Sequence, residues 1–429
     1  MREIVKCARA LVEGVERRDF SFSIEDGKIV DDAATQSGSV ASREFGPEVI
    51  VAPGFINGHS HAYQILLRGW ADDLPFERWR TDALYKVVPR LSPDDVYWTF
   101  VYAFDEMLRA GITTVAEFFY LNGGGNEHAE AAIRAARDTG IRLILARTWM
   151  DVQTAPAEFR ESIDQAAART KALIDAHPDV DVCVAPHSLH AASREMIVAA
   201  AEFAREHDVM LHVHVAEAAY EGEQTRALHD ASPIALLEKW GALNERLVAI
   251  HAIYATTEEK ELLAERGARV VHNPMTNQYL GDGVCDVPSL RTLGVPIALG
   301  TDADVKPSLI DEMRAAALMQ KMARLDGAAL DARAVFDFAT AQGARALRSN
   351  AGRLSGGNDA DYVVIDASHI DPWSPAVNAL VYRGEDNWIV QTFVGGKCVY
   401  SRGAQAQKRL LERSREAVGK IALRLRLGG

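Results

Sequence analysis

Short apolar runs alternate with amphipathic stretches along the middle of the chain. The stretches at 194–207 and 257–266 carry apolar side chains at helical spacing, whereas the runs are continuous and short enough to be buried strands. Such runs, separated by helices, are typical of parallel strands that are covered on both faces. Eight runs over about 250–300 residues predict an α/β fold, a (β/α)8 TIM barrel, better than an open doubly wound sheet. The runs occupy residues 49–55, 113–119, 142–146, 180–185, 209–215, 247–251, 269–272 and 296–300.

The two ends of the chain have a different texture, in which short apolar and polar segments alternate. Near the N-terminus Asp26-Gly27 lies between two such segments, which is a β-hairpin signal. Because a lone hairpin is marginal in water, we expect both ends to form one small β-sandwich that the chain leaves and re-enters. The predicted order is the first part of the sandwich at 1–50, the barrel at 51–354, the second part of the sandwich at 355–402, and a C-terminal helix at 403–429 that docks on the barrel or on a neighbouring subunit.

Charge and cysteine usage narrow the class of partner. The formal net charge of -13 argues against nucleic acid or an anionic membrane surface, because both reward an excess of Lys and Arg. No apolar run approaches the ~20 residues of a membrane span, and we expect no signal peptide. Four cysteines lie far apart without a C-x-x-C pair, so neither a disulfide framework nor a thiolate zinc site is indicated. We therefore expect a cytoplasmic protein.

Histidines and carboxylates lie where nearly every predicted strand ends, which is where a TIM barrel has its active site. His59 and His61 could converge on one ion, because side chains two apart at a strand end project the same way. An isolated pair of this kind is more often two surface histidines. Here a set of core histidines would each need a buried partner, so a functional site is the better interpretation. The residues are His59, His61, Glu117, Tyr120, His187, His190, His212, His214, Glu217, His251, His272, Asn273 and Asp302.

Five motifs, in chain order, carry a family resemblance. They are Pro53-Gly-Phe-Ile-Asn-Gly-His-Ser-His61, His212-Val-His-Val-Ala-Glu217, Ala249-Ile-His251, His272-Asn-Pro-Met-Thr-Asn277 and Gly300-Thr-Asp302. With these motifs nearly the whole chain resembles the amidohydrolase superfamily, within its branch of cytosine, guanine, S-adenosylhomocysteine and triazine aminohydrolases. The resemblance implies a metal-dependent aminohydrolase, a deaminase that hydrolyses a C–N bond at an N–C=N carbon of a small amidine or N-heterocycle and releases ammonia.

The resemblance also implies roles for individual residues. The implied ligands of one divalent metal ion are His59, His61, His214 and Asp302. The implied catalytic residues are Glu217 as proton shuttle, His251, which polarises the attacked centre or steadies the water, and Asp302, which shares the proton transfer. Three imidazoles and one carboxylate suit Zn²⁺ best, with Fe²⁺ as the alternative.

Two points about the metal site depend on the resemblance. By spacing alone either His212 or His214 could be the ligand, and the family pattern His-x-x-Glu favours His214. Two-metal relatives have a modified lysine at the end of the fourth strand, where this chain has Ala185-Pro186-His187, so one ion is expected. A metal-free binding barrel that keeps the fold is the competing interpretation, and the joint presence of the ligands, Glu217 and His251 argues against it.

Local motifs suggest where a small-molecule substrate binds. His59-Ser-His-Ala-Tyr-Gln64, Ala116-Glu-Phe-Phe-Tyr120 and His187-Ser-Leu189 resemble formiminoglutamate deiminase, which implies substrate contacts from Gln64, Tyr120, His187 and His190. That family has an arginine directly after His-Ser-Leu to hold a substrate carboxylate, and His190 cannot act as the same fork donor. A stretch at 311–318 instead resembles the S-adenosylhomocysteine and triazine members. A formiminoglutamate-type iminohydrolase and a cyclic amide or triazine hydrolase therefore remain as alternatives.

The segment at 64–90 follows the first run and is long for a barrel loop. It contains Arg68, Trp70, Trp79 and Arg80, so we expect a lid or a subunit-shared wall that contacts substrate, with a solvated loop as the alternative. Because relatives are often dimers or larger, we also expect a homo-oligomer.

Overall fold

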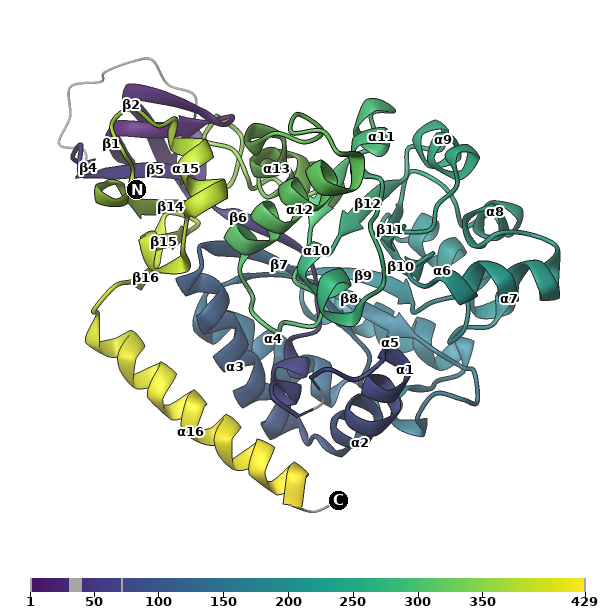
Figure 1. The fold of residues 1–429 in the computed structure, drawn as a ribbon. Coiled ribbons are helices and arrows are strands. Elements are labelled where there is room, and N and C mark those ends of the chain that lie inside the picture. The colour runs from purple at the N-terminus through teal and green to yellow at the C-terminus, as the bar shows by residue number, and fades with distance from the viewer. Residues whose placement is uncertain (1, 31–40, 71, 428–429) are drawn as a thin grey trace.

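The computed structural model describes residues 2–30, 41–70 and 72–427 (Figure 1). Parts of the predicted 1–50 and 403–429 segments therefore lie outside the described residues. In the described part of the chain a ring of parallel strands lies beside a second sheet, and helices surround the ring.

Eight parallel strands form the barrel, as the alternation of runs predicted. Neighbours pair in the order β13-β12-β11-β10-β9-β8-β7-β6. An isolated parallel bridge between Ser60 and Asp302 links the end of the first strand to the residues after the last one. The strands are β6 (Phe55–Ser60), β7 (Ile112–Phe119), β8 (Arg142–Trp149), β9 (Asp181–Pro186), β10 (Leu211–Val215), β11 (Leu247–His251), β12 (Arg269–His272) and β13 (Ile297–Leu299).

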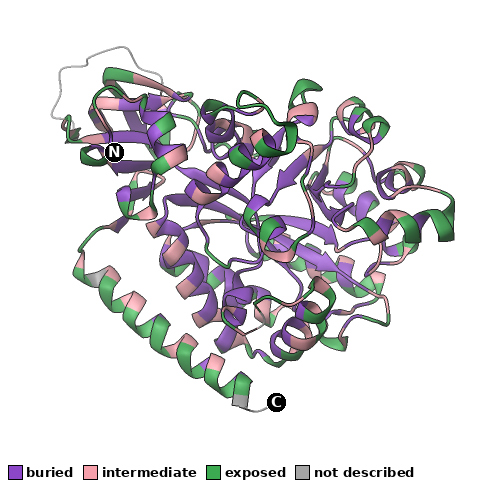
Figure 2. Cartoon of the chain, in the orientation of Figure 1, coloured by how far each residue is buried: buried purple, intermediate pink, exposed green. Residues whose placement is uncertain are grey.

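Helices cover the outer face of the ring, and their sequences show where they begin. Ser92, Ser162 and Thr256 each accept a hydrogen bond from the backbone three residues on, which caps the helix that follows. All residues of β6 and β7 are buried, and exposed residues gather on the outer sides of the helices (Figure 2). The helices are α3 (Pro93–Arg109), α4 (Glu127–Thr139), α5 (Ile163–Ala176), α6 (Arg194–Glu206), α7 (Ala219–His229), α8 (Pro233–Lys239), α9 (Thr257–Glu265), α10 (Pro274–Leu280), α11 (Val287–Thr292), α12 (Leu309–Arg324), α13 (Ala332–Phe338) and α14 (Ala341–Ala346).

The first predicted barrel strand, at 49–55, is wrong as a single strand. Its first part is β5 (Val49–Pro53), which pairs antiparallel with β14 (Tyr362–Asp366) in the second sheet. The chain changes sheets at Gly54, whose N–H donates to Asp361 O, whereas the next N–H, of Phe55, donates to Gly111 O beside the barrel. A side chain at Gly54 would meet the Thr113 hydroxyl at 2.2 Å, so the close approach needs glycine.

Strands from both ends of the chain form the second sheet, as predicted. Its order is β16-β15-β14-β5-β1-β2-β3, with β4 on β1. Asp26 and Gly27 both have positive φ in the tight turn from β2 to β3, which confirms the hairpin. The remaining elements here are β1 (Glu3–Val12), β2 (Val15–Glu25), β3 (Lys28–Val30), β4 (Ala41–Phe45), β15 (Ile389–Val394), β16 (Lys397–Ser401), η5 (Ala367–His369), η6 (Asp386–Trp388) and α15 (Ala376–Arg383).

The C-terminal helix α16 (Gln405–Leu427) runs along the barrel beside α3 (Figure 1). Arg424 pairs with Asp95 at 2.6 Å, and Arg90 donates to the Leu425 carbonyl at 3.0 Å. Ile421 and Leu425 are buried in this contact. The helix therefore docks on the barrel. In the described part of the chain, no helix is both long and apolar enough to cross a bilayer.

Candidate active site

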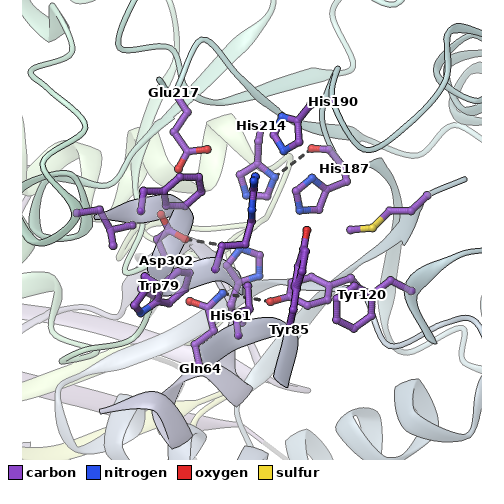
Figure 3. A pocket seen from close by; sticks show the side chains of 17 residues that line it. His61, Gln64, Trp79, Tyr85, Tyr120, His187, His190, His214, Glu217 and Asp302 are labelled. Carbon is purple, nitrogen blue, oxygen red and sulfur yellow. Dashed lines mark hydrogen bonds and ion pairs between the residues drawn. The ribbon is translucent and has the colours of Figure 1, made fainter. Parts of the chain in front are cut away.

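A pocket lies at the C-terminal ends of the barrel strands, and histidines, carboxylates and aromatic rings line it (Figure 3). The four residues expected to contact substrate, Gln64, Tyr120, His187 and His190, all lie in its wall. Gln64 Nε2 donates to the Tyr120 hydroxyl at 3.2 Å, which joins two of them. Further lining residues are His61, Phe76, Trp79, Arg80, Leu84, Tyr85, Met150, Phe159, His214, Glu217, Leu280, Asp302 and Ala303.

The four predicted metal ligands converge at the floor of this pocket. His59 and His61 end β6, His214 lies in β10, and Asp302 follows β13. His59 Nε2 lies 3.1 Å from His214 Nε2 and 3.3 Å from Asp302 Oδ1, and His61 Nε2 lies 3.6 Å from the same oxygen. The backbone holds Asp302 there, because its N–H donates to His59 O and its carbonyl accepts from His61 N–H.

Two backbone carbonyls orient the imidazoles. His61 Nδ1 lies 2.9 Å from Phe118 O, and His214 Nδ1 lies 3.0 Å from His187 O. A carbonyl can only accept, so each Nδ1 carries the proton and each Nε2 keeps its lone pair. The lone pairs of both rings therefore face the space beside Asp302.

This donor set fits a zinc ion. Donors 2.0–2.1 Å from a tetrahedral zinc stand about 3.3 Å apart, close to the spacings of His59 from His214 and from Asp302. Among the described residues His59, His61 and Asp302 form one cluster of closely spaced ligand atoms, and His214 joins it through its contact with His59. Burial lowers the pKa of His61 to about 3 and lowers that of His214 well below its usual value, so both rings are neutral, as ligands must be. Burial opposes ionisation of Asp302, but the hydrogen bond from His59 and the neighbouring imidazoles outweigh it and lower the pKa of the carboxyl. Among the described residues no lysine or arginine pairs with Asp302, so the charge that would balance it is missing from the protein.

Backbone strain marks the same floor. His251 and Asp302 have φ of 76° and 52°, and Ala216, just before Glu217, has φ of 53°. Residues with a side chain rarely adopt this left-handed region, and such residues cluster at functional sites. Of these three positions, His251 and Asp302 are ones to which the sequence assigned a role, and Ala216 directly precedes a third such residue, Glu217.

Glu217 and His251 lie beside the ligand set. His251 Nε2 is 3.5 Å from Glu217 Oε1 and 3.6 Å from Asp302 Oδ2. The Glu221 carboxylate accepts the N–H groups of Ala216, Glu217 and Ala218 at 3.0 Å each, which fixes the loop that carries Glu217. Burial, together with nearby Asp282, raises the pKa of Glu217 well above its usual value. A raised pKa favours the protonated carboxyl, the form that can donate a proton.

Three other predicted strand-end residues lie outside the pocket wall. His212 and His272 are buried deeper in the barrel, and burial lowers the pKa of each to about 3. His212 belongs to neither cluster of possible metal ligands in the described chain, whereas His214 belongs to one. Glu117 accepts from the Ala62 N–H and the Ser60 hydroxyl, and Ser60 also reaches Asp304 at 2.7 Å. These three residues support the floor from behind.

The segment at 64–90 divides into two parts. Trp79 and Arg80 line the pocket, as expected of a lid. Arg68 and Trp70 do not line this pocket. Arg68 donates to the Asp304 carbonyl and to Glu106, and the Trp70 ring lies under Arg426. Its elements are η1 (Ala62–Leu67), α1 (Phe76–Trp79), the π-helix η2 (Arg80–Leu84), α2 (Tyr85–Val87) and η3 (Val88–Arg90).

Sequence reasoning missed several residues of the site. Asn277 approaches the His251 ring, as does Asn273, which the sequence had indicated, and Asp282 approaches Asn277. The signal was present in the motif at 272–277, because two asparagines four apart on a helix share one face. Phe159, in η4 (Ala157–Phe159), and Tyr85 carry no such signal, since only the folding of their loops brings them to the pocket.

Known proteins are similar over nearly the whole chain. A sequence profile of the Amidohydrolase family matches residues 50–399. The 5-methylthioadenosine/S-adenosylhomocysteine deaminase of Thermococcus sibiricus is 32% identical over 360 residues, 82% of each chain. The 5'-deoxyadenosine deaminase of Methanothermobacter thermautotrophicus is 33% identical over 396 residues, 89% of this chain and 90% of that one. A crystal structure of an adenosine deaminase from Xanthomonas campestris with bound zinc superposes with a TM-score of 0.89 over 98% of both chains, at 27% identity.

Proposed function

The chain belongs to the amidohydrolase family, and from this membership we propose that it holds one zinc ion and deaminates a substrate that carries an anionic group. It is a metal-dependent aminohydrolase that acts on a C–N bond. The observation that carries the proposal is the convergence of His59, His61, His214 and Asp302 at the floor of a pocket lined by Glu217.

The donor atoms support zinc and a single ion. Three imidazole nitrogens and one carboxylate oxygen are a set that zinc prefers. A second ion would need a bridging group at the end of β9, where the chain has Ala185, Pro186 and His187. The similar adenosine deaminase structure contains zinc. We therefore assign zinc ahead of iron, with one ion per chain.

The residues around the ligands divide the work of hydrolysis. When bound, a zinc ion supplies a Lewis acid and makes water a nucleophile near neutral pH. Glu217 takes a proton from the attacking water and delivers it to the departing nitrogen, because an amide anion is too basic to leave unprotonated. His251 donates a hydrogen bond towards the attacked centre. Asp302 lies close enough to share the proton with Glu217 through the same space.

Arg80 supports an anionic substrate. Its guanidinium lies in the pocket wall, its Nε is buried without a hydrogen-bond partner in the described chain, and none of the ion pairs among the described residues involves it. The Phe76 and Tyr85 rings lie 5.5 and 5.9 Å from its Cζ, and the Tyr220 hydroxyl hydrogen-bonds with it. The Arg80 guanidinium is positioned by aromatic rings and forms no ion pair with a carboxylate of the described chain, so it can bind a carboxylate of the substrate.

Two classes of substrate fit this wall. The relatives named above support a 5'-modified adenosine, and S-adenosylhomocysteine carries a carboxylate that 5-methylthioadenosine lacks. A small amidine on an amino acid is the second class, supported by His187 and His190 at the positions noted in the sequence. One arginine in the pocket wall can pair with one carboxylate. A substrate with two carboxylates, such as formiminoglutamate, would therefore have no arginine for its second carboxylate here.

Ammonia release tests the proposal with pairs of substrates that differ only in the carboxylate. Wild type should prefer the carboxylate-bearing member of each pair. Arg80→Met should lower kcat/KM for that member by at least about 30-fold, since losing one partner of a desolvated charge pair costs ~2 kcal/mol or more. The neutral member should change little. Arg78→Met, two residues away and paired with Asp82 at the surface, is the control.

Two outcomes would contradict different parts of the proposal. No ammonia from any N–C=N compound would remove the assigned reaction. Equal effects of Arg80→Met on charged and neutral substrates would contradict the proposed anionic substrate group but not the assigned reaction.

We further propose a cytoplasmic homo-oligomer. The described chain has four free cysteines, of which Cys398 is exposed, and free thiols suit a reducing compartment. Leu318 and Met322 on α12 are 49% and 73% exposed and line a groove together with Met275 and Val284. Leu325, directly after α12, is 93% exposed. A contiguous exposed apolar patch supports a subunit contact.

A further inference from the structure

The two side-chain amides near His251 approach one atom of its ring. Asn273 Nδ2 lies 3.3 Å and Asn277 Nδ2 lies 3.2 Å from His251 Nδ1. All three side chains are buried. On the other side of the ring, Nε2 faces Glu217 and Asp302. The state of Nδ1 therefore decides what the ring offers to the reaction.

Asp282 fixes which way the Asn277 amide points. Asn277 Nδ2 lies 3.3 Å from Asp282 Oδ2, and the Asp282 N–H donates to the Asn277 backbone carbonyl at 3.0 Å. Asn277 Nδ2 is the donor in this contact, so the NH₂ end of the amide faces the carboxyl. Burial raises the pKa of Asp282 to about 7, and this hydrogen bond lowers it by favouring the carboxylate. The NH₂ group has two hydrogens, and its second one points to His251 Nδ1.

A neutral imidazole has one N–H group, so a ring that accepts at Nδ1 carries its proton at Nε2. Such a ring is also neutral, because the imidazolium cation carries a proton on both nitrogens and could not accept at Nδ1. Nε2 is then a donor that faces two carboxylates at 3.5 and 3.6 Å. The amide and the carboxylates favour the same tautomer from opposite sides.

The tautomer also selects between two possible ligand sets. His59, His214 and His251 form one cluster of closely spaced ligand atoms, and His59, His61 and Asp302 form the other. A protonated Nε2 has no lone pair for a metal ion. We infer that Asn277, oriented by Asp282, keeps the proton of His251 on Nε2, so that His251 stays out of the metal site and faces the substrate as a hydrogen-bond donor. Asn277 is thus a positioning residue, and its importance to turnover rests on the proposed function.

Nitrogen NMR of the full-length protein tests this inference directly. Protein labelled with ¹⁵N-histidine is measured as purified and after chelation, and the His251 signals are assigned by their loss in His251→Gln. Wild type should show a protonated Nε2 and an unprotonated Nδ1 in both samples. Asn277→Asp replaces a donor with an acceptor and should move the proton to Nδ1. Asn277→Ala should give a mixture of the two tautomers.

Gln278→Ala is the matched control, because Gln278 is the next residue of the same helix and is exposed. It should leave the His251 signals unchanged. Asn277→Asp should also lower kcat by about 10–100-fold, as is typical when a group that orients a catalytic side chain is lost. A wild-type ring protonated at Nδ1 would overturn the inference without any variant, as would an unchanged tautomer in folded Asn277→Asp. Neither result depends on ammonia release, so failure of the proposed reaction is distinguishable.

Discussion

His59 Nε2 and His214 Nε2 lie 3.1 Å apart, although the two residues are 155 positions apart in the sequence. They lie on β6 and β10, which have three strands between them in either direction around the barrel. The contact therefore crosses the barrel mouth. The Phe118 and His187 carbonyls turn the lone pairs of His61 and His214 into the same space, where a cation is the natural partner.

The purified protein should carry about one zinc ion per chain, and His59→Ala or Asp302→Ala should lower this content and abolish most activity. Elemental analysis measures it. Chelation should also lower the melting temperature, because an ion that binds only the folded state stabilises it. His212→Asn is the control, since His212 lies deeper in the barrel and should not be needed for the ion. Equal metal content in wild type and both ligand variants would contradict the assignment.

The barrel and the positions of the four candidate ligands at strand ends were predictable because each leaves a local trace. A strand buried on both faces appears as a continuous apolar run, and each ligand follows such a run or lies within it. The same rule failed at 49–55, because two strands of different sheets are both buried and join without a polar break. The only local sign is Pro53-Gly54, and the change of sheet is visible only in the hydrogen bonds of Gly54 and Phe55.

The pocket wall was less predictable, because it depends on the register of short helices. Arg68 and Arg80 lie in one segment of similar composition, yet Arg80 lines the pocket and Arg68 holds the Asp304 carbonyl. Asn277 lies on a helix face that turns towards β11, and only the packing of α10 against the barrel shows this. The sequence indicated the residues that end strands and, from other elements, Gln64, Trp79 and Arg80, whereas Tyr85, Phe159 and Asn277 became visible only in the structure.

The stability of the metal-free protein should fall as the pH drops from about 6.5 to 4, in part because of His272. Both ring nitrogens of His272 lack a partner in the described chain, and burial lowers its pKa to about 3. In this range the unfolded state binds a proton that the folded state does not, so stability rises with pH and is lost towards acid. His272→Gln should make the slope of unfolding free energy against pH shallower by about 1.4 kcal/mol per pH unit. Urea unfolding of wild type and variant at several pH values measures this slope. The same slope in both proteins would refute the prediction.

Arg147→Met should destabilise the fold by up to about 3–5 kcal/mol, the usual cost of breaking a buried ion pair, because Glu161 would keep only its hydrogen bond with Arg169. Arg147 and Glu161 are fully buried and form two hydrogen bonds of 2.7 and 2.8 Å, and Arg169 supplies a third at 2.6 Å. The loop they hold carries Phe159 to the pocket. Denaturant unfolding measures the loss. Lys171→Met, which breaks a surface pair with Asp175, should change stability little.

Light scattering should show wild type larger than a monomer, and Leu318→Glu combined with Met322→Glu should shift it to a monomer. The two introduced glutamates would be buried at the proposed contact, and burying unpaired charges is costly, so the contact should not form. Leu423→Glu on α16 is the control, because Leu423 is 59% exposed and lies away from this groove. A monomeric wild type would remove the proposed contact.

Glu217→Gln should keep the metal and the substrate site while losing most turnover. The carboxyl lies 3.5 Å from His251 Nε2 in the pocket wall. Burial and nearby Asp282 raise its pKa, which favours the protonated form that can deliver a proton to a leaving nitrogen. Glutamine has nearly the same shape but cannot carry that proton, so kcat should fall by at least about 10²–10⁴-fold.

If Glu217 only stabilises the loop before α7, the variant should instead retain kcat within a few-fold and melt at a lower temperature. Glu221→Gln is the matched comparison, because Glu221 holds that loop through three N–H groups and has no place in the pocket wall. Steady-state kinetics, metal analysis and melting curves on both variants separate proton transfer from loop support.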